Sequence, residues 1–322
     1  MMIKRIFGEL PDWAKQENPL LRYEIVRRQD KSESPVGRIL MWVIGLTVLI
    51  LGGYIYATDG MQRGLQLPYT LDIWRIVIFP LLFLQIIMRI AGLSLGVGAV
   101  TDERQRQTWD NLRATERGAE IGLRTRLASV FYRLRSVIFT VMVGRIVLVG
   151  AILYELTSMQ GGYLDLLTAR AIPVVSVQVG VILLAAFMTA FIIMPLTATG
   201  VDIALGLLIS TTVRNRAIST VLQVLIVVFR TVTTLGLFWI SWQFLNEEIA
   251  LEGYSALSAI GASAIFADWG LVLSQLSTAG QLWADIPYTV FLGVFMLAMV
   301  VIQVLIAGGC MLLAVRAAEV RE

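Results

Sequence analysis

Four charged residues lie inside long apolar stretches of this chain. Arg89, Arg145 and Arg230 each fall within such a stretch, and Asp202 lies in the latter part of another. A charge at the centre of a bilayer costs roughly 2.5–3.5 kcal/mol on insertion scales, so these side chains are expected to face protein or water. In one interpretation, Asp202 pairs with an arginine and the other arginines snorkel or bind backbone carbonyls. In the other, the arginines line a path for an anionic substrate such as a lipid-linked phosphate, with Arg89 as the best single candidate.

Other kinds of chemistry find little support in the sequence. The chain has no histidine and one cysteine, Cys310, so it lacks the commonest general base and metal ligand and can form no internal disulfide. We see no serine- or aspartate-based arrangement typical of a membrane enzyme, and we expect no catalytic residue, metal site or cofactor in this chain. Four glutamines in apolar stretches are expected to form hydrogen bonds between helices: Gln85, Gln178, Gln223 and Gln303.

The elements that position these residues are predicted to be membrane-spanning helices. Of the 322 residues, 57% are hydrophobic and 15% are charged, whereas soluble domains are about 45–50% apolar and about 25% charged. A spanning helix needs about 20 apolar residues. We therefore predict an all-α membrane protein with six spans, the fourth kinked at Pro195 or Gly200 rather than divided into two short segments. The spans cover residues 39–57, 76–100, 136–154, 172–213, 217–245 and 288–315.

The distribution of basic residues predicts the orientation. Of the 26 Lys and Arg residues, only Arg63, Arg75 and Arg170 fall on one side of the six spans. Apart from the three arginines within spans, all the others fall on the opposite side, which the positive-inside rule identifies as the cytoplasm. Both termini and residues 101–135 are therefore expected to be cytoplasmic. Because the basic residues report topology, and no nucleic-acid recognition motif accompanies them, we expect no nucleic-acid partner.

Residues 1–38 are predicted to form a cytoplasmic arm that includes an interfacial amphipathic helix. Asn18 suits the N-cap and Pro19 the first helical position, while Leu21 lies among arginines that can meet anionic headgroups. A solvated basic arm is the alternative. On the other side of the membrane, residues 246–286 are expected to form short extracytoplasmic helices.

The charged segment 101–135 is too long for a plain connection between two spans, which needs only about 2–8 residues. Thr101 or Asp102 can cap a short helix, and Trp109 and Leu112 share one face of it. After a bend, an amphipathic stretch would lead into the third span. A short helix with large apolar anchors can dock in the groove of a partner, so we predict a cytoplasmic docking helix.

The sequence of this segment resembles the coupling-helix region of type-2 ABC transporter permeases, the membrane subunits of many bacterial exporters. Their pattern is roughly Glu-Arg-Glu-x-Gly-Thr-Leu-x-x-Leu. Here Glu103, Arg104, Thr108 and Leu112 match the pattern. Three positions depart from it: Gln105 replaces the second Glu, Gln107 the Gly and Trp109 the Leu. The missing glycine implies a straighter helix.

Three further stretches extend the resemblance over most of the chain. "NPLLRYEIVRR" is similar to the elbow helix before the first span, "ALGLLISTTVRNRAIS" to the end of the fourth span, and "AVRAAEVRE" to the end of the last one. The resemblance implies a multi-pass protein of the bacterial plasma membrane. It also implies pairing with a second permease subunit, identical or different, and a separate ATP-binding cassette subunit. The chain has no Gly-x-x-x-x-Gly-Lys-Ser/Thr phosphate loop, so ATP and Mg²⁺ are expected on that partner.

Two other classes of protein remain as alternatives. The first is an ATP-independent membrane carrier or a membrane scaffold. A carrier would need ionisable groups at mid-depth for coupling, and Asp202 is the one acidic candidate in the spans that we considered. The second is a membrane enzyme, which lacks an identifiable site.

Overall fold

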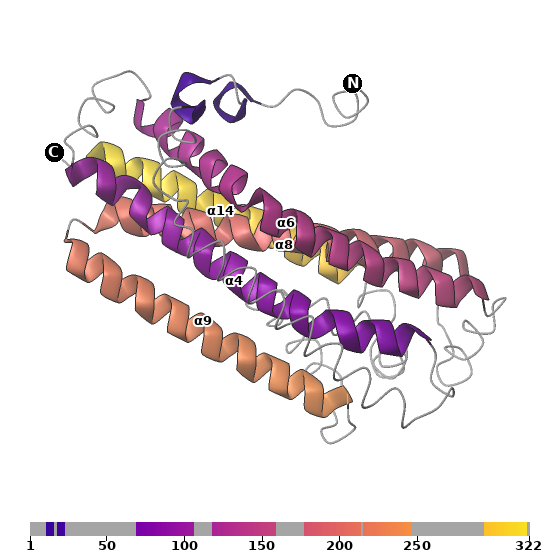
Figure 1. Ribbon diagram of the computed structural model, residues 1–322. Helices are drawn as coiled ribbons and strands as arrows, with labels where there is room; N and C mark the ends of the chain where they lie inside the picture. Colours follow the sequence, from indigo (N-terminus) through magenta and orange to yellow (C-terminus); the bar gives the residue numbers. More distant parts are fainter. Residues whose placement is uncertain are drawn as a thin grey trace.

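The computed structural model describes residues 11–15, 18–22, 69–105, 118–158, 177–213, 215–245 and 293–320. These parts of the chain contain helices and no strand. Five long helices, α4, α6, α8, α9 and α14, follow a short 3-10 turn, η1, at Asp12–Ala14 (Figure 1). The long helices cover Tyr69–Gln105, Gly118–Ser158, Val177–Thr212, Arg216–Leu245 and Gly293–Val320.

Four of these helices are long and apolar enough to cross a membrane. The candidate spans lie at Pro80–Val100, Ala185–Thr212, Ala217–Leu237 and Val294–Glu319. The described part of the chain therefore has the character of a multi-pass all-α membrane protein. Helix α6 includes the predicted third span, 136–154, but it is not one of the four, and residues 39–57 and 246–286 lie outside the described residues. Six spans thus stay a prediction.

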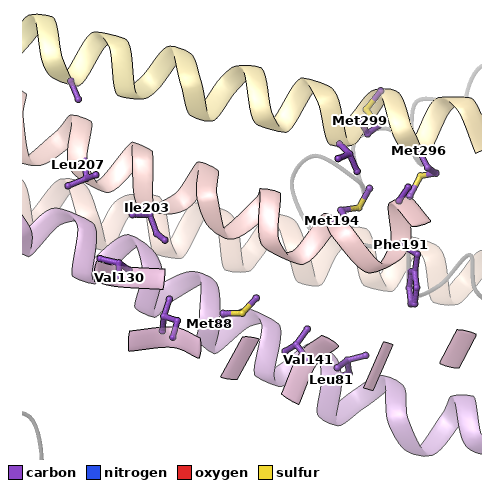
Figure 2. Packing of buried hydrophobic residues seen from close by; sticks show 14 of the residues in the cluster. Leu81, Met88, Val130, Val141, Phe191, Met194, Ile203, Leu207, Met296 and Met299 are labelled. Atoms are coloured by element: carbon purple, nitrogen blue, oxygen red, sulfur yellow. The ribbon is translucent and has the colours of Figure 1, made fainter. Parts of the chain in front are cut away.

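Helix α8 lies at the centre of the bundle and packs against α4, α6 and α14. It continues through Pro195 as one helix from Val177 to Thr212, so the alternative of two short membrane segments is wrong over this range. Buried side chains from four helices meet around it, as Figure 2 shows for Met88 of α4, Val141 of α6, Ile203 of α8 and Met299 of α14.

Helices α4 and α8 approach each other closely at two glycines. A Cβ atom built on Gly96 would lie 2.8 Å from the carbonyl oxygen of Ile203, and one built on Gly206 would lie 2.6 Å from that of Leu93. A side chain at either position would force the two helices apart, so glycine allows this close contact. The backbone N–H of Val100 also donates a 3.0 Å hydrogen bond to Ser210 Oγ. The two helices thus touch through backbone.

The end of α4, the start of α6, the turn between α8 and α9 and the C-terminal end of α14 all lie at one end of the bundle (Figure 1). The N-terminal turn is at this end too. As predicted, Asn18 caps the turn at residues 19–22, because its side-chain oxygen accepts a 3.0 Å hydrogen bond from Leu20 N. Leu21 is fully buried with Ala14 and Ala128, so it contacts α6. The interfacial position of the arm stays a prediction.

Candidate functional site

Asp202 is the centre of a charge cluster contributed by three helices. Its carboxylate is fully buried in α8. Arg89 of α4 donates from Nε to Oδ2 at 2.8 Å, and Arg230 of α9 contacts Oδ1 through Nη1. The expected pairing of Asp202 with an arginine is therefore confirmed, and the carboxylate serves two arginines rather than one.

The way α4 and α8 run explains why Arg89 and Asp202 meet. Three contacts join the two helices: Arg89 with Asp202, Gly96 with Gly206 and Val100 with Ser210. In this order the residue number increases along both helices. The two helices are therefore parallel, and the glycine contact fixes their register within two turns of the ion pair. A buried ion pair needs accurate geometry because desolvation of each ion costs several kcal/mol, and a close helix crossing supplies that geometry.

Helix α9 completes the cluster through few contacts. Gln223 Nε2 donates to Ser94 Oγ at 2.7 Å, and Leu222 and Ile226 pack against buried Leu93 and Ile209. About two turns further along α9, Arg230 reaches Asp202. Because both polar contacts lie on one face of α9, the helix is oriented towards α4 and α8.

A pocket of about 460 Å³, counting the space at its open side, lies between α4, α8 and α9. All three charged residues line it, together with Gln85 of α4 and Thr231 and Thr234 of α9. Most of the remaining wall is aliphatic, for example Leu82, Ile86 and Val227. The site thus combines a charged group with apolar walls, which suits an amphiphilic ligand better than a fully hydrated ion.

Arg145 of α6 is fully buried in a separate setting. Its Nη1 donates to the backbone carbonyl of Phe191, and the guanidinium lies 4.6 Å from the centre of the Phe191 ring. Pro195 explains why this carbonyl is available: proline has no N–H to donate to the carbonyl four residues earlier. With the Gln85 amide turned so that its oxygen faces the same guanidinium, this oxygen accepts from Nε at 3.0 Å. The expectation that an arginine binds a backbone carbonyl is confirmed.

The predicted docking residues are only partly within the described residues. Glu103, Arg104 and Gln105 belong to the last turn of α4, while Thr108, Trp109 and Leu112 lie outside the described residues. Because α4 runs unbroken to Gln105, the expected new helix start at Thr101 or Asp102 is wrong. The expected bend between the docking helix and the third span involves residues 106–117, which lie outside the described residues, and from Gly118 to Ser158 α6 is one helix.

Sequence reasoning identified the four charged residues and a pairing of Asp202 with an arginine, but not which arginines would contact it. It did predict hydrogen bonds between helices for the glutamines, which is confirmed for Gln223 and for Gln303, whose Oε1 accepts from Thr197 Oγ1 at 2.5 Å. The side chain of Gln178 lies outside the described residues. The role of Pro195 in exposing the Phe191 carbonyl was missed, although an in-helix proline four residues after an aromatic residue was a visible signal.

No grouping of three or more acidic, cysteine or histidine side chains that could hold a metal ion occurs within the described residues. In comparisons with known proteins, no family model, no curated protein and no solved structure matches this chain. Fold and site together define the class as a helical, multi-pass membrane protein with a buried charge cluster.

Proposed function

We propose that this chain is the transmembrane permease subunit of an ATP-binding cassette exporter of the bacterial plasma membrane. It contributes to the substrate pathway and couples to a separate ATP-binding subunit. The observation that supports this most is the arrangement of helices around the coupling segment. Helix α4 extends beyond its apolar part, which ends at Val100, to Gln105, and α6 begins at Gly118.

Two long helices therefore flank residues 106–117, and both pack against α8. A helix transmits an axial push because its backbone hydrogen bonds resist compression, and packed helices shift as units. In the proposed mechanism, nucleotide binding by the partner displaces the coupling segment. The displacement reaches the Gly96–Gly206 contact and the Asp202 cluster through α4.

One face of α9 offers a place for a second membrane subunit. Apolar residues on this face are each at least half exposed and recur at alternating intervals of three and four positions. They are Ile218, Val221, Leu225, Val228, Val232, Leu235 and Trp239. Val224 and Phe229 beside them are exposed as well, so α9 presents a broad apolar surface that is open to lipid or to another helix. The pairing of two permease subunits, as the family resemblance implies, would cover part of this surface.

The experiment that tests the proposal is co-purification with vanadate-sensitive ATPase activity. Replacing Trp109 and Leu112 together by Asp puts two charges into the apolar docking face, and we expect the ATPase activity in the purified complex to fall to background. The matched control, Trp109→Phe with Leu112→Ile, keeps the face apolar and should retain the activity.

Two outcomes would contradict the proposal. One is ATPase activity that is unchanged in the Asp variant. The other is transport by the purified chain without any nucleotide-hydrolysing partner, which would favour the ATP-independent carrier. In both measurements the elution profile of the purified protein shows separately whether each variant is folded.

A further inference from the structure

The pocket between α4, α8 and α9 holds an unequal number of opposite charges. Arg89 and Arg230 carry two positive charges, and Asp202 carries one negative charge. These three groups lie in helices long and apolar enough to cross a membrane. In such surroundings an added negative charge gains more Coulomb energy than it would in water, because the effective dielectric constant is lower. The cluster therefore attracts one anionic group.

Arg230 is the member of the cluster that a ligand can reach. Its side chain is 20% exposed, whereas the side chains of Arg89 and Asp202 are 8% and 1% exposed. Arg89 and Asp202 lie between the closely packed α4 and α8, while Arg230 comes from α9, which makes fewer contacts. A ligand anion can therefore share Arg230 with Asp202 while the Arg89–Asp202 pair stays intact.

The walls of the pocket select the rest of the ligand. Leu82 and Ile86 of α4 and Val227 of α9 present aliphatic surface beside the arginine. A hydrated inorganic anion would lose its water shell against these walls without replacement, which is costly. A hydrocarbon chain, in contrast, is stabilised by contact with these aliphatic side chains. The polar groups next to Arg230 are Thr231 and Thr234, one turn or less away on the same helix.

We infer that this pocket binds the head of an anionic amphiphile, a carboxylate or phosphate group attached to a hydrocarbon chain, with Arg230 as the principal contact. Binding itself needs no ATP-binding partner and is tested without one. Only the further step, that this amphiphile is the transported substrate, rests on the proposed function.

The test is photolabelling of the full chain in nanodiscs of phosphatidylcholine, which is zwitterionic. A diazirine-bearing palmitate and a diazirine-bearing phosphatidic acid are added separately, and the labelled peptides are located by mass spectrometry. We expect labels on residues 82–93 and 227–234, removed by excess unlabelled oleate and not by inorganic phosphate. Removal by inorganic phosphate alone would overturn the inference, because the site would then take a soluble anion. Labelling spread evenly over all the helices would overturn it too.

Three substitutions separate binding from folding. Arg230→Gln should reduce labelling by about tenfold or more, whereas Arg230→Lys, which keeps the charge, should lose much less. Asp202→Asn removes the carboxylate that competes for Arg230, so labelling of the folded fraction should increase. Arg124→Gln, in a part-exposed pair with Glu120 near the start of α6, is the matched control and should leave labelling unchanged.

The opposite responses of Arg230→Gln and Asp202→Asn are decisive. A purely structural cluster would lose labelling in both variants, and that result would overturn the inference. Each variant is compared only after its monodisperse elution shows that it is folded.

Discussion

Helices α4 and α9 both contact α8, but the two contacts differ in kind. The contact of α4 with α8 is close and involves backbone atoms, with Gly96 against Gly206 and Val100 N–H bonded to Ser210. Helix α9 instead uses side chains that reach across, with Arg230 bound to Asp202 of α8 and Gln223 bound to Ser94 of α4. Much of the surface of α9 remains exposed and apolar.

The difference indicates which parts of the protein act as one body. Close backbone contact excludes water and lipid and allows little relative motion, since packed interfaces are not continuously deformable. Long side chains can keep their contact while the helix that carries them shifts. We infer that α4, α6, α8 and α14 shift together as one body, and that α9 can move relative to them while Arg230 and Gln223 keep it attached.

The largest loss of stability is expected at Asp202, the residue of α8 that contacts both α4 and α9. Asp202→Ala leaves the buried Arg89 and the part-buried Arg230 without their shared carboxylate, which should lower the free energy of unfolding by about 3–5 kcal/mol. Thermal unfolding in detergent, followed by circular dichroism, measures the change. The control is Glu120→Ala, which removes the partner of Arg124 in a part-exposed pair and should cost only about 0.3–0.5 kcal/mol. Equal losses of unfolding free energy in the two variants would mean that the buried cluster stabilises the fold no more than the part-exposed pair does.

A smaller loss is expected at the backbone contact. Gly96→Ala places a methyl group 2.8 Å from the Ile203 carbonyl oxygen, which forces α4 and α8 apart and should cost about 1–3 kcal/mol. Gly98→Ala, on the same helix with nothing within 4 Å of its added Cβ, should be neutral or stabilising by up to about 1 kcal/mol. The same unfolding assay compares them. If both variants unfold alike, the glycine contact is not what holds the two helices at this distance.

The smallest effect is expected at Gln223, the other residue that keeps α9 attached. Gln223→Leu removes the hydrogen bond to Ser94 and should cost about 0.6 kcal/mol, the average for such bonds between membrane helices. A double-mutant cycle with Ser94→Ala measures the coupling of the two side chains. Additive losses would show that the hydrogen bond does not tether α9.

Much of the helical framework could be predicted, because apolar runs of about 20 residues have few other stable forms in a bilayer. The predicted range 217–245 agrees closely with α9, Arg216–Leu245. The prediction erred at Thr101 and Asp102, where capping residues indicated a new helix but α4 simply continues. Local capping signals cannot show whether a preceding helix has ended, because the same residues are tolerated in a helix interior at small cost.

The candidate site was predictable in its members but not in its geometry. Charged residues in apolar runs stand out in any sequence, so Arg89, Arg145, Asp202 and Arg230 were all found. The sequence could not show which arginine would pair with Asp202, since Arg89 lies 113 positions away from it. The separate binding of Arg145 to the Phe191 carbonyl depends on where α6 meets α8.

The sequence by itself determined that this chain is helical and apolar, and which charged side chains must be kept away from lipid. Both conclusions follow from the free-energy cost of exposing backbone polar groups and charges to hydrocarbon. Only the tertiary structure decided that two arginines share Asp202 beside an apolar pocket while a third lies apart. That outcome depends on the crossing of α4 and α8 at Gly96 and Gly206, and the register of two helices is set by packing across the whole contact rather than by either sequence alone.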